Sequence, residues 1–357
     1  MYILRKRFYN NYLLIFALTF VFVLFFCEYF IYYIVLTQCN WPSLDPHKTV
    51  SSVDSPKLNE RPVRAMFISD THLLGPKNGH WFDKLRREWQ MYRAFQTSIA
   101  IHKPDIIFIL GDIFDEGDWS NDKEFDNYVS RFRSLFSVSN GIRLYTVAGN
   151  HDIGFHYAIT PYSNQRFVNK MKAPSVRRIS SNDHLKCAKG IRNNCTKSDE
   201  LSIYSRPILL QHYPLYRISD EICNELDEAP HEIKRLQFRE RWECLSKEAS
   251  EQMNLKLLDI LNPRLVVGGH THYGCRRIHR DDILEFTIPS FSWRNINNPS
   301  FLLGIFTPSN FSVSKCYMPV ESTVILIYSI SIACFFVCLI IKYIPKTILI
   351  VFLKVKS

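Results

Sequence analysis

The chain has 357 residues, of which 46% are apolar and 22% are charged, a composition that excludes a disordered protein and allows one large domain or two small ones. The formal net charge is +10, but seven positive charges lie beside two long apolar runs; without these seven and Glu28, 37 basic residues face 33 acidic ones. No basic tract or nucleic-acid motif accompanies this near balance, so no nucleic-acid partner is expected.

The first apolar run spans residues 12–36 and follows Arg5-Lys6-Arg7. It is long enough to cross a bilayer, too long for a signal-peptide core, and no small-residue cleavage site follows it. We therefore predict a retained transmembrane helix at 12–36, with a cleaved signal as the alternative.

A second apolar run without charge spans residues 324–341 and is followed by lysines. Because basic flanks favour the cytosolic side, segments 1–11 and 342–357 are expected in the cytosol. Residues 37–61 are rich in Pro, Ser and charge without periodicity, which predicts a stalk, and the domain at 62–318 is expected on the luminal or outer side.

Strands and helices are predicted to alternate in the first half of the domain. Strands are expected at 63–69, 105–110 and 142–148, where apolar runs are short and continuous. Apolar residues at helical spacing predict helices at 81–102 and 125–136. The apolar positions of the first of these helices are Leu85, Trp89, Tyr92, Phe95 and Ile99.

The second half of the domain is predicted to add a second sheet. Strands are expected at 206–211 and 265–268, separated by a charged, mostly helical insertion at 220–261. Runs at 283–288 and 302–306 are expected to close this second sheet. The pattern predicts an α/β sandwich with parallel pairing, in which chemistry is placed beyond the carboxyl ends of the strands.

Polar side chains follow five of these strands. Gly149-Asn150-His151-Asp152 follows the third strand, and its glycine is expected to permit a sharp turn. Candidate site residues at the five strand ends are Asp70, His72, Asp112, Asp115, Asn150, His151, His212, His270 and His272. Carboxylate, amide and imidazole donors without a thiolate suit Mn, Fe or Zn in a reactive site, and a bridging carboxylate would make a two-metal site.

The ordered series D-x-H, G-D-x-x-D, G-N-H-D, H and G-H-x-H resembles the calcineurin-like metallophosphoesterase family. The resemblance implies a β-sandwich flanked by helices, here with an N-terminal and a C-terminal transmembrane helix. It also implies one metal on Asp70, His72 and His272, another on Asn150, His212 and His270, and Asp112 between them. His151 is then expected to serve the leaving oxygen, oriented by Asp115.

Within this family the chain resembles membrane-anchored phosphodiesterases that act on GPI anchors. The two apolar runs carry this resemblance together with the segments 211–217, 289–295 and 298–301. It implies removal of an ethanolamine-phosphate branch from the second mannose of the GPI glycan, with two divalent metals expected to be Mn²⁺. It further implies GPI-anchored proteins and cargo transport as partners, at endoplasmic reticulum exit sites, the intermediate compartment or the Golgi.

Two alternatives stay open. One is a luminal enzyme that hydrolyses another lipid or nucleotide-sugar phosphodiester. The other is a catalytically inactive cargo receptor or scaffold, which would be expected to have lost ligands, whereas here every ligand position is filled.

Several features bear on the compartment and on folding. Seven cysteines lie outside the apolar runs, an odd number, and Cys187 with Cys195 would close a short loop. Sequons at Asn194 and Asn310 agree with a luminal glycoprotein. Segment 169–205 lacks a strand that relatives have, and the spacing of Lys354 and Lys356 departs from a dilysine retrieval signal. The histidines without motif support are expected at the surface: His47, His80, His102, His156, His184, His231 and His279.

Overall fold

The computed structural model describes residues 2–45, 61–77, 79–155, 158–173, 206–236, 247–280, 282–308 and 310–343. It divides into two compact units, of which unit 1 is Met1–Val35 with Pro319–Ser357 and unit 2 is Leu36–Met318. The predictions about Cys187, Cys195, Asn194, most of segment 169–205 and the two C-terminal lysines lie outside the described residues.

Unit 1 contains the two apolar helices. The first runs through α1 (Tyr2–Phe25), the π-helical turn η1 (Phe26–Phe30) and α2 (Ile31–Leu36), and the second is α10 (Glu321–Tyr343). By length and composition, Leu14–Leu36 and Glu321–Ile340 can each cross a membrane. The Tyr328 hydroxyl donates to the Glu28 carboxylate at 2.7 Å, so the charge that interrupts the first run is paired with the second helix.

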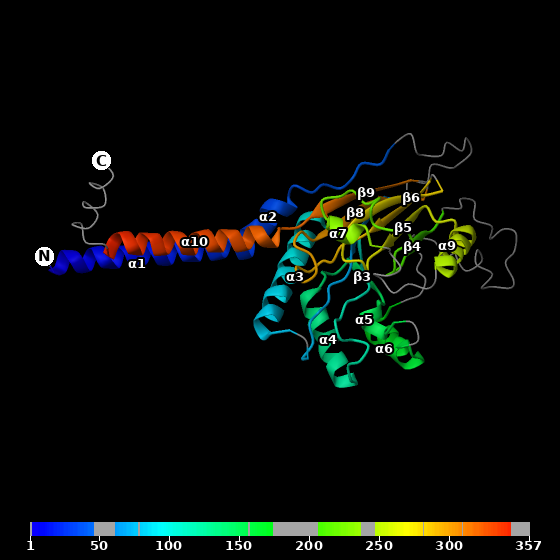
Figure 1. Cartoon of the computed structure of the whole chain (residues 1–357), viewed down its shortest axis with the longest axis horizontal. Coiled ribbons are helices and arrows are strands. Elements are labelled where there is room, and N and C mark those ends of the chain that lie inside the picture. Colours follow the sequence, from blue (N-terminus) through cyan, green and yellow to red (C-terminus); the bar gives the residue numbers. More distant parts are fainter. Residues whose placement is uncertain are drawn as a thin grey trace. The chain divides into compact units, whose positions relative to one another are not determined.

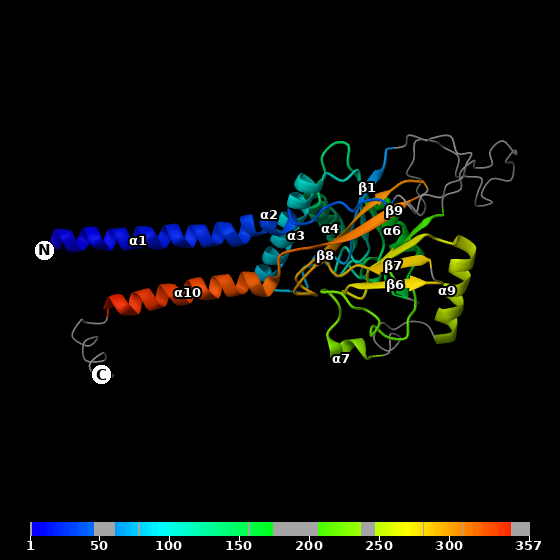
Figure 2. The same cartoon turned by 90° about the horizontal axis from the view of Figure 1, so that it is seen from above.

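The first sheet of unit 2 has the order β3-β2-β1-β8-β9 among the described strands. Its paired strands β8 and β9 lie side by side in both views (Figures 1 and 2). Strands β1 (Val63–Ile68), β2 (Ile106–Leu110) and β3 (Arg143–Val147) are parallel, whereas β8 (Ser300–Phe306) and β9 (Phe311–Tyr317) extend the sheet antiparallel. All five residues of β2 are buried, as expected of a continuous apolar run in a parallel sheet.

The placement of β8 corrects a prediction. The run 302–306 was expected in the second sheet, but it pairs with β1, from Val63 opposite Phe306 to Phe67 opposite Leu302. Six of the seven residues of β8 are buried, so the strand is covered on both faces and fits the interior of either sheet. Its apolar run therefore predicts a buried strand without identifying the neighbouring strand. The edge strand β9 was not predicted.

The second sheet has the order β4-β5-β7-β6. Strands β4 (Ile208–Leu210), β5 (Leu265–Gly268) and β7 (Ile283–Thr287) are parallel and agree with prediction, and β6 (Cys275–His279), which was not predicted, is antiparallel to β7. The segment 220–261 is helical at α7 (His231–Lys234) and α9 (Lys247–Leu261), whereas the rest of its described residues form turns and irregular backbone.

The hydrophobic core lies between the two sheets. Phe67 and Phe108 from the first sheet pack with Leu265, Val267 and Phe286 from the second. On the outer face of the second sheet, Leu258 of α9 joins a cluster with strand residues. These contacts make the sandwich that the sequence predicts.

Helices cover the outer face of the first sheet. Phe301 of β8 points away from the core and lies 6.2 Å, ring to ring, from His102 at the end of α3 (Trp81–His102). His102 was expected at the surface, but it is buried beneath these contacts. The neighbouring α4 (Asp122–Leu135) begins at an Asn121 and Glu124 capping box, and α6 (Pro161–Met171) begins after Thr160.

The first part of the expected stalk is attached to the domain. A disulfide joins Cys39 to Cys316, and the Trp41 indole donates to the His102 carbonyl at 3.0 Å. The Asn310 side chain is buried and its Nδ2, the atom a glycan would modify, donates to the Asp45 carbonyl at 2.7 Å. Asn310 is therefore not accessible as a glycosylation site in this fold. Residues 46–60 lie outside the described part.

Candidate metal centre

The structure brings together all nine predicted site residues at the carboxyl ends of the strands. Asp70 and His72 follow β1, Asp112 and Asp115 follow β2, and His212 follows β4. Asn150 and His151 begin α5 (Asn150–Ile153) after β3, and His270 and His272 follow β5. Within each sheet the parallel strands end at the same edge, and the two sheets pack against each other, which is why residues so far apart in sequence meet here.

Asp112 belongs to two groups of donor atoms. One contains Asp70, His72, Asp112 and His272, the other contains Asp112, His212 and His270, and within each group the donor atoms lie within 4.8 Å of one another. The Asn150 Oδ1 atom lies 3.1 Å from His212 Nε2 and so joins the second group. This division is the one that the motif resemblance implies.

The first group converges on a small volume. His72 Nε2 and His272 Nε2 are 3.0 Å apart, and they lie 3.8 and 3.7 Å from the Asp70 Oδ1 atom. Two imidazole nitrogens and a carboxylate oxygen directed at one point form a donor set that suits a divalent cation. The residues therefore fit the metal that the motifs predict.

Three imidazoles are oriented by bonds to their Nδ1 atoms. His212 Nδ1 lies 2.8 Å from the Leu110 carbonyl and His151 Nδ1 lies 2.9 Å from the Asp115 carbonyl, and a carbonyl oxygen can only accept. His72 Nδ1 lies 3.2 Å from the Asp115 carboxylate. With the proton on Nδ1, the Nε2 atom of each ring is left as the donor to a metal, or as the atom that meets substrate.

Asp115 orients His151 in a different way from the one expected. Its main-chain carbonyl holds His151, while its carboxylate contacts His72 and forms an ion pair at 2.5 Å with Arg294. Arg294 was not predicted as a site residue. It lies in the segment 289–295, which carries part of the family resemblance seen in the sequence. These contacts lower the pKa of Asp115 to about 2 against the opposing effect of burial, so the carboxylate stays ionised.

Comparison with known proteins assigns the family. A family model described as calcineurin-like phosphoesterase matches residues 63–274, more than half of the chain. The chain belongs to the calcineurin-like phosphoesterase family. Metallophosphoesterase 1 of Cricetulus griseus is 43% identical to this chain, in an alignment that covers 91% of this chain and 88% of the relative. Metallophosphoesterase 1 of Danio rerio is 42% identical, covering 88% of this chain and 87% of its own.

Solved structures resemble the chain more weakly. The alignment with a dimetal phosphatase from Danio rerio covers 72% of this chain and all of the phosphatase, at 12% identity and a TM-score of 0.34. The family and the donor groups together make this chain a metal-dependent phosphoesterase with a site for two divalent ions.

Electrostatics in the calcineurin-like phosphoesterase centre favour bound cations. Burial raises the pKa of Asp70 to about 6. Burial opposes a charge on His212, yet the Asp112 carboxylate raises the pKa of His212 to about 9. Burial and His212 lower the pKa of His270 to about 3, which keeps this imidazole neutral and able to bind a metal. The carboxylates thus favour positive charge beside them, which a metal would supply in place of the His212 proton, while His270 is neutral already.

The backbone of the phosphoesterase loops is strained where ligands are placed. In the described part of the chain, nine non-glycine residues have positive φ, and five of them are predicted ligands. These five are Asp70, His72, Asp112, His270 and His272. A left-handed conformation is costly for a side-chain-bearing residue and persists where the surroundings determine it, which here points the ligands inward.

Gly149 is required for a reason other than the expected turn. Its φ of −109° is open to any residue, but an added Cβ atom would lie 2.2 Å from the Asp112 main-chain nitrogen. The missing side chain therefore lets the β3 loop approach Asp112. That approach allows the His151 main-chain N–H to donate to the Asp112 carboxylate at 2.9 Å.

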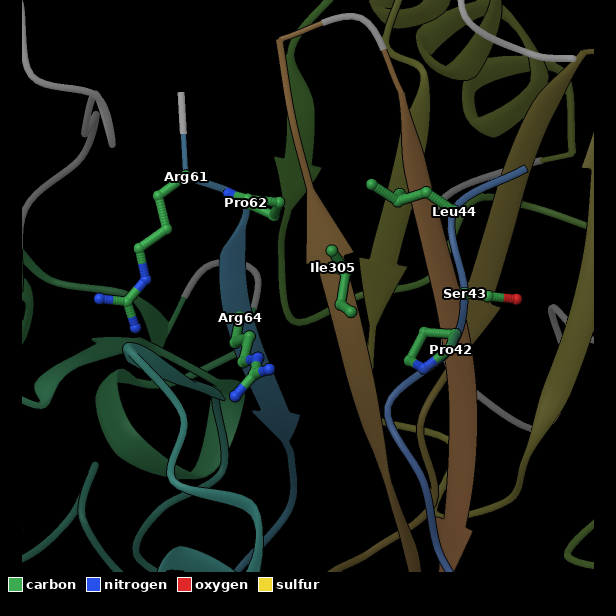
Figure 3. Close-up of a pocket in the computed structure, with 7 residues that line it drawn as sticks. All are labelled: Pro42, Ser43, Leu44, Arg61, Pro62, Arg64 and Ile305. Atoms are coloured by element: carbon green, nitrogen blue, oxygen red, sulfur yellow. The ribbon is translucent and has the colours of Figure 1, made fainter. Parts of the chain in front are cut away.

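A separate groove lies away from this centre. It has a volume of about 310 Å³ and lies between residues 42–44 and the beginning of β1, with Arg64 in its lining (Figure 3). Arg64 is at the start of β1 whereas Asp70 follows its end, so the groove is not part of the phosphoesterase site.

Proposed function

We propose that this phosphoesterase is a membrane-bound phosphodiesterase that removes the ethanolamine-phosphate branch from the second mannose of GPI anchors. The donor set centred on Asp112, in a chain with two helices that can cross a membrane, carries the proposal. A substrate that is itself a membrane glycolipid explains why the catalytic unit has an apolar helix at both ends. The resemblance in segments 211–217 and 289–295 supports the choice of substrate.

The proposed setting is the early secretory pathway. Unit 2 faces the lumen, both termini lie in the cytosol, and GPI-anchored proteins awaiting transport are the substrates and partners. The disulfides Cys39–Cys316 and Cys223–Cys275 support an oxidising compartment.

Each site residue has a proposed role. Asp70, His72 and His272 would hold one ion, Asn150, His212 and His270 the other, with Asp112 between them, and Mn²⁺ is the proposed metal. Such ions neutralise phosphoryl oxygens and lower the pKa of a bound water. His151, whose Nδ1 is held by the Asp115 carbonyl, presents Nε2 to donate a proton to the departing alkoxide oxygen.

The test is mass spectrometry of GPI glycans from cells that lack this protein. We expect ethanolamine phosphate to be retained on the second mannose, and its removal to be restored by the wild-type chain. Unchanged glycans in the deficient cells would exclude this substrate and leave another lipid or nucleotide-sugar diester.

Two variants test the chemistry. Asp112→Asn should lose bound metal and activity, because it removes the carboxylate shared by both groups. His151→Ala should retain metal and lose activity by about 10²–10⁴-fold, because it removes a proton donor. Metal analysis and hydrolysis of bis(p-nitrophenyl) phosphate by the purified full chain check both. Substoichiometric metal and no turnover in the wild type would favour the inactive scaffold.

A further inference from the structure

Helix α3 exposes apolar side chains and shields its charged ones. In its first half the exposed residues are Trp81, Phe82, Leu85 and Trp89, with exposed fractions of 68%, 57%, 60% and 41%. The charged residues between them, from Asp83 to Glu88, are all half-buried. A surface helix in water normally has the opposite arrangement.

This apolar face is not a misplaced core face. The buried side of α3 is formed by other residues, among them Met91, Ala94 and Phe95. We call the exposed set Trp81, Phe82, Leu85 and Trp89 the outer stripe. Two large indoles and a phenyl ring in a contiguous patch are typical of a surface that contacts another apolar phase.

The charges beside the outer stripe favour a surface that bears phosphate. α3 contains four basic residues against two acidic ones, Asp83 and Glu88. Asp83 accepts a bond from Arg87 and Glu88 pairs with Arg131, so both acids are already neutralised. Lys77, in the loop before α3, lies 4.6 Å from the exposed ring of Trp119. The aromatic surface is thus flanked by positive charge.

The chain enters and leaves unit 2 beside the carboxyl end of the same helix. Trp41, five residues after Leu36, donates to the His102 carbonyl. At the other terminus, the Met318 N–H donates to the Pro299 carbonyl at 2.9 Å, two residues before Phe301, whose ring contacts His102. Both connections to the apolar helices are therefore anchored at one end of α3.

We propose that the outer stripe of α3 lies in the headgroup region of the phospholipid bilayer that holds the two apolar helices. Tryptophan and basic residues are enriched at that depth, because indole rings are amphipathic and cations meet lipid phosphates. A protein partner or a second copy would have to cover the same face. The bilayer is favoured because both chain connections are anchored on α3 itself, at its carboxyl end, about 20–30 Å along the helix from the outer stripe. The inference does not depend on the identity of the substrate.

Photo-crosslinking in a reconstituted bilayer tests this placement. The full chain, with p-benzoylphenylalanine in place of one residue, is put into vesicles of phosphatidylcholine and phosphatidylserine and irradiated. The positions are Leu85 on the outer stripe, Ile260 on α9 as an equally apolar surface control, and Ile330 on α10 as the positive control. Within unit 2, α3 and α9 lie at opposite edges in both views (Figures 1 and 2).

We expect lipid adducts at positions 85 and 330 and background yield at position 260. Adducts at position 85 to a second copy or to another protein, or equal lipid yields at positions 85 and 260 with position 330 labelled, would overturn the proposal.

A matched pair of variants adds a second readout. Trp81→Ser combined with Leu85→Ser and Trp89→Ser should slow the removal of ethanolamine phosphate from a GPI glycolipid embedded in the vesicle, a readout that rests on the proposed function, while leaving hydrolysis of soluble bis(p-nitrophenyl) phosphate unchanged. Leu255→Ser combined with Ile260→Ser, on α9, should change neither rate. Equal rates on the embedded substrate for the triple variant and the wild type would also contradict the proposed contact.

Discussion

Asp152 joins two loops that carry candidate metal ligands. Its buried carboxylate accepts from the main-chain N–H groups of Ile113, Phe114 and Gly149 at 2.8–3.2 Å. These hydrogen bonds connect the loop after β2, which carries Asp112, to the loop after β3, which carries Asn150 and His151. The sequence alone leaves this residue as either a loop support or a tuning group, and the contacts identify the first role.

Asp152→Asn should lower the free energy of unfolding by about 1–3 kcal/mol, because the new amide group directs a donor at an N–H that needs an acceptor. The midpoint of denaturant unfolding of the metal-free chain measures the loss. Asp259→Asn is the control, since Asp259 is mostly exposed and pairs with Arg280 at the surface. Equal midpoints for the two variants would contradict the role of Asp152.

Arg294 acts on the centre through Asp115, and Asp115 in turn contacts His72. Arg294→Gln should reduce Mn²⁺ affinity or activity by about 10–100-fold, the usual effect of losing a group that orients a ligand. Arg294→Lys should recover part of the loss because it keeps the charge. Metal titration followed by diester hydrolysis separates the two effects.

Arg280→Gln provides the comparison for Arg294, because it breaks a surface ion pair of the same chemistry. If both arginine variants bound metal and hydrolysed the diester like the wild type, Arg294 would have no part in the site.

At the scale of elements, a disulfide, an ion pair and a hydrogen bond connect Cys223 and Asp227, in the segment after His212, to the strands. A disulfide joins Cys223 to Cys275 on β6. Asp227 is fully buried, lies 2.8 Å from Lys315 on β9 and accepts from the Ser300 hydroxyl on β8. These contacts connect the segment to both sheets.

Lys315→Met should destabilise the protein by about 3–5 kcal/mol, because it leaves the buried Asp227 carboxylate without its cation. Lys170→Met breaks an exposed pair with Asp126 and should cost about 0–1 kcal/mol. Thermal unfolding of the two variants in detergent compares them directly. A smaller loss for Lys315→Met than for Lys170→Met would show that burial does not govern this pair.

Helix α3 shows what periodicity leaves open at this scale. Leu85, Trp89 and Tyr92 have helical spacing and predict the helix, and the helix is present. Periodicity does not state which face a partner will cover. In the structure Leu85 and Trp89 belong to the exposed outer stripe, whereas Met91 and Phe95 lie on the buried face of the helix.

At the scale of the whole molecule, the disulfide Cys39–Cys316 joins residues separated by 277 positions and therefore ties the two ends of unit 2. Closing so long a loop removes much entropy from the unfolded chain. If a membrane already holds both neighbouring helices, part of that entropy is lost before folding.

Replacing Cys39 and Cys316 together by alanine should reduce the free energy of unfolding by about 2–4 kcal/mol. The loss should be smaller in vesicles than in detergent micelles, where the helices can separate. Cys334→Ala is the control, since Cys334 is a free, exposed cysteine. An equal effect of the control and the double variant on the unfolding midpoint would rule out this stabilisation.

The sequence by itself determined the strands whose ends carry the candidate ligands, the order of those residues along the chain and the two apolar helices. These features depend on short segments of sequence, since a continuous apolar run predicts a buried strand and a motif of a few residues predicts the chemistry at its end. It also predicted that the nine candidate site residues lie together beyond the carboxyl ends of strands, and the structure brings them together there from β1, β2 and β3 of one sheet and β4 and β5 of the other.

Only the tertiary structure decided which groups meet across the fold. It paired β8 with β1, joined the Asp115 carboxylate to His72 and Arg294, directed Asp152 at the loop of Asp112, and turned the stripe of α3 outward. Such contacts join residues far apart in the chain, and their choice depends on packing and burial of all the elements together. No local pattern of side chains records that choice.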